Sequence, residues 1–308
     1  MFADTLQLTR CAQIGPDAAF REPEVDPIDA LAGRIGALAA DVLVRELETW
    51  PKPGLVSPLD AGSHDDMDVP QFLASIDAVA PYFVQLAVCG AEGGDLEDLR
   101  GIGRDAETAM MAATGGVNTH RGAIFALGLL CAAAGSRSRD RMTRTTLSAR
   151  LNAEGVCEHV AQHWGEAIFR GPIPLHSHSS KMGRRHGAGG ARAEAASGFW
   201  HARFVGLPAL RWVRSQGVPE RAANVQAFFA LLATIDDTNI LYRGGETGAR
   251  AARSAAALFL AHGGVLKAGW DEGALAIHRN FVSQGLSPGG CADLLSVTLF
   301  LDAIDNLS

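Results

Sequence analysis

The sequence predicts an all-α fold built as a single compact multi-helix domain. Apolar residues recur at helical spacing in several long segments, and no segment shows the sustained two-residue alternation of a strand. Polar turns rich in glycine and proline separate these segments. We expect the turns to gather at one end of the packed helices and form one active-site pocket. Residues 26–308 would make up this catalytic domain, and residues 1–25 a loosely packed N-terminal arm.

The first half of the chain carries clear helix start and stop signals. Asp26 followed by Pro27 is typical of a helix start, and the apolar face that follows extends to about Thr49. The prolines and glycines of residues 51–68 exclude regular structure there. Further helices are expected over about 69–88, about 95–113, and from Asn118 into a long apolar run.

The second half is expected to alternate helices with polar segments. The basic stretch 136–144 reads as a surface loop before a helix to about His163, and residues 169–198 read as irregular. Ser287 is a plausible N-cap, with Pro288 in the first helical position. The remaining helices are expected at 208–216, 219–235, 247–262 and 288–304.

Composition narrows the class of protein. A formal net charge of −7 argues against a nucleic-acid partner, because duplex binders need a basic face. No apolar run is long enough to span a bilayer, so we expect no membrane partner. The five cysteines contain no C-x-x-C pair and the N-terminus lacks a secretory signal, which favours a cytoplasmic protein with reduced cysteines.

The turn before the long apolar helix carries the first candidate site. Gly115 and Gly116 predict a tight turn, and Asn118 or Thr119 can cap the helix that follows. His120 and Arg121 then stand at the positive end of the helix dipole. This arrangement predicts a phosphate-binding site.

Other polar turns repeat the combination of cations, acids and glycines. The irregular segment 51–68 combines Lys52 and His64 with Asp60, Asp65, Asp66 and Asp68. Arg192 and Glu194 follow a glycine-rich turn, and Arg243 precedes Gly244 and Gly245. A guanidinium beside flexible backbone suits a phosphate.

A magnesium site is predicted at Asp236 and Asp237. We expect both to fall at the end of a helix, where a carboxylate opposes the dipole, and residues placed against local preference are often functional. With Asn239 they provide the oxygen ligands that Mg²⁺ prefers.

Two common ligand motifs are not supported. The sequence GIGRDA at 101–106 matches the relaxed dinucleotide fingerprint, but no strand precedes it. His176 and His178 lack a third zinc ligand at the usual spacing.

Six ordered segments together resemble the triphosphoribosyl-dephospho-coenzyme A synthase family. They are PKPGLV at 51–56, GSHDDMD at 62–68, TGGVNTHRGAIFALGLLCAAAG at 114–135, GARAEA at 190–195, DTNILYRGG at 237–245 and SPGGCADLL at 287–295. The resemblance implies an all-helical enzyme that joins ATP to 3′-dephospho-coenzyme A and releases adenine. The 2′-hydroxyl of dephospho-coenzyme A would attack C1′ of the ATP ribose, and the triphosphate would stay on the product. The chain departs from the family pattern at Arg121, Ala193, Tyr242 and Cys291.

The resemblance also implies roles for the polar residues. Loss of adenine develops positive charge on the sugar, so the reaction needs a nearby carboxylate and acid–base groups. We expect Asp65, Asp68 and Glu194 to supply them, and which one is the base stays open. Mg²⁺ on Asp236 and Asp237 would hold the triphosphate together with Lys52, Gly115, Gly116, Asn118, His120, Arg121, Arg192, Asn239 and Arg243.

The expected product is the precursor of an acyl-carrier-protein prosthetic group. It would pass to the enzyme that modifies the carrier protein of malonate decarboxylase or citrate lyase, and we favour malonate decarboxylase. A homodimer is compatible with the sequence. The alternatives are an all-α magnesium-dependent prenyl-diphosphate or terpene synthase, whose aspartate spacing DDMD and DDTN do not reproduce in full, and a non-catalytic helical nucleotide-binding protein.

Overall fold

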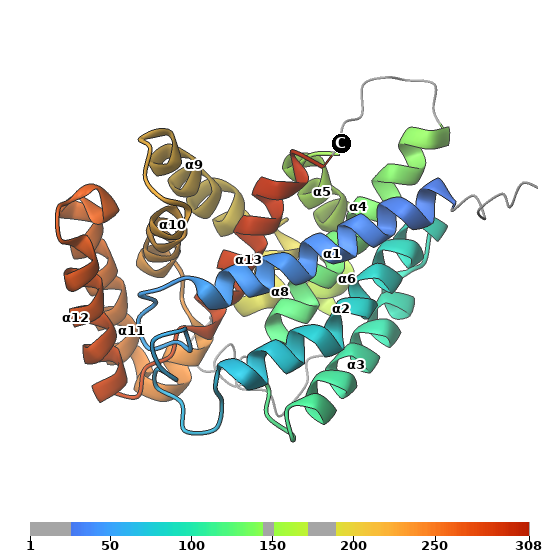
Figure 1. Ribbon diagram of the computed structural model, residues 1–308. Helices are drawn as coiled ribbons and strands as arrows, with labels where there is room; N and C mark the ends of the chain where they lie inside the picture. The colour runs from blue at the N-terminus through green and yellow to red at the C-terminus, as the bar shows by residue number, and fades with distance from the viewer. Residues whose placement is uncertain (1–25, 144–150, 172–188, 308) are drawn as a thin grey trace, which may run out of the picture.

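A computed structural model describes residues 26–143, 151–171 and 189–307, and every regular element within these ranges is helical (Figure 1). The predicted all-α fold is therefore confirmed, as a single helical domain. The predicted N-terminal arm and the pair His176 and His178 lie outside the described residues.

The first four helices pack against one another. Their bounds are α1 Pro27–Glu48, α2 Val69–Glu92, α3 Leu96–Ala113 and α4 Arg121–Thr143. The predicted starts are confirmed by caps, since the carboxylate of Asp26 accepts from the backbone of Ile28. Helices α1, α2 and α4 pack through fully buried apolar residues such as Ile35, Phe83 and Leu127.

Close contact between α2 and α4 depends on small residues. An added Cβ at Gly90 would lie 2.0 Å from the carbonyl oxygen of Ala132, so a side chain there would force the two helices apart. Among the described helices, α2 alone is long and apolar enough to cross a membrane by length and composition. A core helix passes the same test, and α2 packs against α1, α3 and α4.

The second half wraps around the central helix α13, Gly289–Ile304. Nearly every side chain of α13 from Leu294 onward is buried, as is most of α10. Helices that are apolar all round form the centre of a fold. The elements before α13 are α5 Ala153–His159, η1 Val160–Trp164, α6 Gly165–Arg170, α8 Gly190–Ala196, η2 Ala202–Gly206, α9 Leu207–Ser215, α10 Glu220–Thr234, α11 Thr238–Ala261, η3 Gly264–Leu266 and α12 Trp270–Ser283.

Two sequence expectations are wrong here, and one helix was missed. The expected surface loop at 136–144 is helical as far as Thr143, because α4 continues beyond its apolar run. Residues 190–196, expected to be irregular, form α8. Helix α12 was not predicted at all.

The irregular segment from Thr49 to Asp68 is confirmed, and it is held in place by α12. The imidazole of His278 contacts the carbonyl oxygen of Lys52 at 3.0 Å and the carboxylate of Asp60 at 3.1 Å. The hydroxyl of Ser63 donates to the carbonyl of Leu286 at 2.6 Å. These contacts fix a segment that has no regular hydrogen bonding of its own.

Candidate active site

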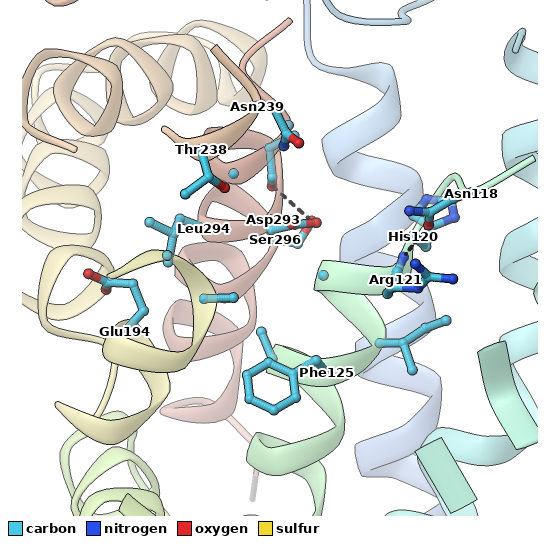
Figure 2. A pocket seen from close by; sticks show the side chains of 18 of the residues that line it. Asn118, His120, Arg121, Phe125, Glu194, Thr238, Asn239, Asp293, Leu294 and Ser296 are labelled. Atoms are coloured by element: carbon cyan, nitrogen blue, oxygen red, sulfur yellow. Dashed lines mark hydrogen bonds between the residues drawn. The ribbon is translucent and has the colours of Figure 1, made fainter. Parts of the chain in front are cut away.

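A cavity of ≈ 1340 Å³ opens between α4, α8, α11 and α13 (Figure 2). Typical cavities for a single drug-sized ligand measure roughly 300–1,000 Å³. The wall from α2, α3 and α4 carries apolar residues such as Phe72, Met111 and Phe125, and it also carries the charged residues Arg100, Arg104, Glu107 and Arg121. The wall from α8, α11 and α13 is polar. The cavity can therefore hold both an apolar ring and a charged group.

The N-terminus of α4 borders the cavity, as the sequence predicts. The side chain of Asn118 accepts from the backbone N–H of Arg121 at 3.1 Å, which confirms its capping role. Asn118, His120 and Arg121 lie together in Figure 2, across the cavity from Thr238 and Asn239. The guanidinium of Arg121 donates to Glu107 at 2.9 Å.

Asp293 of α13 faces the same helix start. Its carboxylate accepts from the backbone N–H of Ala123, and an added Cβ at Gly122 would lie 2.0 Å from it. Glycine is thus required at position 122 for this approach. Burial, with Glu46 and Asp237 nearby, raises the pKa of the Asp293 carboxyl well above its usual range.

The carboxylate of Asp237 accepts hydrogen bonds from the first backbone N–H groups of both α11 and α13. One carboxylate oxygen accepts from the backbone of Asn239 and Ile240 at the start of α11, and the other from Cys291 at the start of α13, at 2.9 Å. Burial still raises the pKa of this carboxyl, although the backbone donors oppose the shift. The N-termini of α4, α11 and α13 therefore all meet at the cavity.

This geometry corrects two expectations. Asp237 begins α11 rather than ending α10, so the helix dipole favours its charge. Ser287 does not cap α13. Its hydroxyl contacts His64 Nε2 at 2.8 Å, and Asp237 satisfies the backbone of Cys291 instead.

Glu194 and His201 form a pair on the cavity wall. One carboxylate oxygen of Glu194 accepts from His201 Nδ1 at 2.5 Å, and the other accepts from the backbone N–H of His201 at 3.2 Å. A carboxylate that binds Nδ1–H orients the ring and leaves Nε2 as the basic nitrogen. Such a pair can accept a proton from a hydroxyl.

Two arginines predicted to bind phosphate line the cavity. Arg192 donates to the carbonyls at the end of α6, including that of Gly171 at 2.7 Å. Arg243 donates to the carbonyls of Ser63 and Gly285, both at 3.2 Å, and contacts His64 Nδ1 at 3.3 Å. Burial and the charge of Arg243 lower the pKa of His64.

The remaining predicted residues do not reach the cavity wall. Lys52 is 1% exposed and its ammonium is paired with Glu46, which itself lines the cavity. Gly115 and Gly116 have positive φ angles and end α3. Asp65 is exposed, and Asp68 is the N-cap of α2 in a capping box with Gln71.

The carboxylates predicted to share Mg²⁺ have separate partners. Asp236 pairs with Arg253, whereas Asp237 accepts from backbone N–H groups and from the thiol of Cys291. No cluster of three or more histidine, cysteine or acidic side chains suited to a metal occurs in the part of the chain that the structure describes. Mg²⁺ on nucleotides needs only one or two carboxylates, and Asp237 and Asp293 both border the cavity.

Comparison with known proteins identifies the family. The family model for ATP:dephospho-CoA triphosphoribosyl transferase matches residues 32–308. The chain belongs to this transferase family.

Similar proteins carry the corresponding name, probable 2-(5''-triphosphoribosyl)-3'-dephosphocoenzyme-A synthase. The Acinetobacter calcoaceticus protein is 37% identical over 89% of this chain and 92% of its own length. The Pseudomonas putida protein is 36% identical over 90% of this chain and 97% of its own length. No solved structure matches the chain.

Within this transferase, several polar residues of the cavity wall were not expected from the sequence, among them Glu46, His201 and Asp293. Asp293 could have been found as one of two acids in the apolar run that becomes α13. The pairing of His201 with Glu194 depends on the turn between α8 and η2, and spacing alone does not reveal it.

Proposed function

We propose that this chain transfers the triphosphoribosyl group of ATP to 3′-dephospho-coenzyme A and releases adenine. The observation that carries the proposal is the convergence of six separate sequence segments on one cavity. Each contributes to its wall through residues such as Val56, His64, Asn118, Arg192, Asn239 and Asp293. The volume suits two nucleotides better than one.

The charged and polar groups of the cavity suit the triphosphate. Arg121, Arg192 and Arg243 supply positive charge along the cavity, and Asn118 and Asn239 supply amide groups. The helix starts of α4, α11 and α13 add partial positive charge. Together these groups support binding of a polyanion in a protein of negative net charge.

Glu194 and His201 are the best-placed base for the attacking hydroxyl. His201 Nε2 would accept the proton of the dephospho-coenzyme A 2′-hydroxyl, and Glu194 would stabilise the imidazolium that results. A second acidic group is needed for the departing adenine, and Asp293 borders the same cavity. Asp65 and Asp68 are less favoured because neither lines it.

Mg²⁺ remains part of the proposal. Asp237, with the amide oxygen of Asn239, would hold it, and the ion would neutralise the phosphate charge when bound. Asp236 would need to leave Arg253 to take part. If the double substitution Asp236→Ala with Asp237→Ala left adenine release and its Mg²⁺ dependence unchanged, these two residues would have no role at the metal.

An assay for free adenine tests the function. The protein is incubated with ATP, Mg²⁺ and 3′-dephospho-coenzyme A, and adenine is measured together with the mass of the coupled product. We expect adenine release only when both substrates are present. Turnover of an isoprenoid diphosphate instead would favour the prenyl-diphosphate synthase class, and binding without turnover would favour a nucleotide-binding protein.

The biological setting is part of the same proposal. The product would serve an enzyme that modifies an acyl carrier protein, of malonate decarboxylase or of citrate lyase, in the cytoplasm. Activity of the carrier protein's parent enzyme in a strain that lacks this chain distinguishes the two pathways. Size-exclusion chromatography with light scattering tests the homodimer.

A further inference from the structure

His120 has an environment that does not suit the cationic phosphate ligand expected from the sequence. The residue is 3% exposed, and burial together with the charge of Lys52 lowers its pKa to about 3. The imidazole is therefore neutral at physiological pH. A neutral ring still offers one N–H donor, and the neighbouring hydroxyls determine which nitrogen carries the hydrogen.

Two hydroxyl groups form a relay that selects the tautomer. Thr119 Oγ1 donates to Ser75 Oγ at 2.7 Å, so the hydrogen of Ser75 is directed elsewhere. Ser75 Oγ lies 2.7 Å from His120 Nδ1. If Ser75 donates its hydrogen to Nδ1, the ring hydrogen resides on Nε2.

His120 Nε2 has no hydrogen-bond partner among the described residues, although it is buried. A buried donor left without an acceptor costs about 1–3 kcal/mol. His120 also lines the cavity, where Phe72 contacts its ring edge-to-face with centroids 4.8 Å apart. The donor is thus fixed in place beside an aromatic ring of the site.

We propose that His120 donates a hydrogen bond from Nε2 to a ring nitrogen of an adenine base bound against Phe72, and that Ser75 is the positioning residue that fixes this donor. This inference rests on the proposed function, because both substrates of that reaction carry adenine. Nε2 is covered in this structure, so binding includes a small shift of the side chains around it.

The chemistry of the wall favours a base over a phosphate. A phosphate is bound best by charged donors, which the cavity offers at Arg121, Arg192 and Arg243 rather than at the neutral ring of His120. A neutral N–H beside an aromatic ring suits a planar, uncharged heterocycle, which stacks on aromatic side chains and accepts at its ring nitrogens.

Nitrogen NMR of the whole protein with labelled histidine tests the tautomer directly. We expect the His120 signals to show hydrogen on Nε2 and none on Nδ1, unchanged between pH 5 and pH 8. The signal is assigned by its loss in His120→Gln. Hydrogen on Nδ1, or titration of the ring within this range, would overturn the proposal.

Ligand additions to the same sample identify the acceptor. ATP without dephospho-coenzyme A, dephospho-coenzyme A without ATP, and inorganic tripolyphosphate are added separately. A shift of Nε2 with ATP or with dephospho-coenzyme A supports the proposal and shows which adenine is bound. A shift with tripolyphosphate alone, or with none of the three, contradicts it.

Kinetics separate positioning from folding. Ser75→Ala should raise KM for the bound nucleotide or lower kcat/KM by about tenfold, the usual effect of one hydrogen bond, and His120→Gln should lose less than His120→Ala because its amide keeps a donor. Ser138→Ala is the matched control, since this buried serine of α4 donates to Ala134 away from the cavity. Equal losses in Ser75→Ala and Ser138→Ala would contradict the role of Ser75. Adenine release by the wild type reports on the reaction independently of all these results.

Discussion

Burial of the Asp293 carboxyl should lower the stability of the folded protein at neutral pH, although the residue contributes to the cavity wall. Its folded-state pKa is raised above the usual 3.8, so the folded protein binds a proton there more tightly than the unfolded chain does. The contribution of this group to stability is present below 3.8 and is lost as pH rises through the folded pKa. Functional sites often carry such costs.

Asp293→Asn should therefore gain stability relative to the wild type as pH rises. We expect the difference in Tm to become more positive from pH 4 to pH 8, while adenine release falls. Thermal unfolding across this range, with exposed Asp77→Asn as the control, measures the effect. A Tm difference independent of pH would show that burial of this carboxyl carries no such cost.

Glu194 is the residue on which the proposed base depends. Glu194→Gln keeps the shape but removes the charge that would stabilise the His201 imidazolium, so kcat should fall by at least about 100-fold. The measurement is the rate of adenine release at saturating substrates. Glu166→Gln, an exposed glutamate of α6 paired with Arg170, should change it little. Similar rates for both variants would exclude Glu194 from the chemistry.

At the scale of single residues, sequence reasoning succeeded where the local signal carried the answer. Asn118 caps α4 as predicted, because an N-cap is a short-range interaction. Lys52 was assigned to phosphate from its polar loop, yet the fold buries it against Glu46, and no local pattern reveals such a tertiary contact. His201 was missed for the same reason, whereas Asp293 does have a local signal, since it is an acid within an apolar run.

Substitution of Gly101 and of Gly122 by alanine tests whether the close approach of α13 to α4 requires a glycine. Nothing lies within 4 Å of a Cβ added at Gly101, so Gly101→Ala should raise the free energy of unfolding by about 0.4–1 kcal/mol. At Gly122 the same change would displace the Asp293 carboxylate from the start of α4. Urea unfolding and adenine release measured together should show a stabilised, active Gly101→Ala and an impaired Gly122→Ala. Equal behaviour would mean that the approach of α13 to α4 is not required.

Helix existence was predicted better than helix extent. The first three helices have strong caps and apolar faces, and their starts agree with the sequence within a residue. Helix α4 runs on through basic residues that read as a loop, since packing of its apolar part supports the whole helix. Helix α12 went unpredicted because its start carries neither a capping side chain nor the proline that marks the starts of α9, α10 and α13.

For the whole molecule, the sequence predicts that the polar turns meet in one cavity, and the structure has such a cavity. The prediction depended on six segments whose order, rather than any one motif, indicated the family. The distribution of apolar and charged residues around the cavity could not be read from the sequence, because it arises from how α2, α3 and α4 face α11 and α13.

If the cavity holds both substrates at once, their effects on stability should add. ATP at about 100 times its Kd should raise the free energy of unfolding by about 2.7 kcal/mol. A 2′-deoxy analogue of dephospho-coenzyme A cannot attack C1′, so with ATP it should give a higher Tm than either ligand alone. Thermal shift measurements check this, and a mutual exclusion of the two ligands would indicate a single nucleotide site.

The contacts of His278 with Lys52 and Asp60 in the segment 49–68 limit how the protein can be divided into fragments. His278 of α12 holds the segment 49–68 in place, and this segment carries His64 to the cavity. A part of the site from the first quarter of the chain therefore depends on a helix near its end. A fragment that stops after α11 would lose α12 and α13. It would also lose the contacts that order the segment 49–68, more than two hundred positions earlier in the chain. Complementation by separately produced halves is therefore a more promising design than truncation.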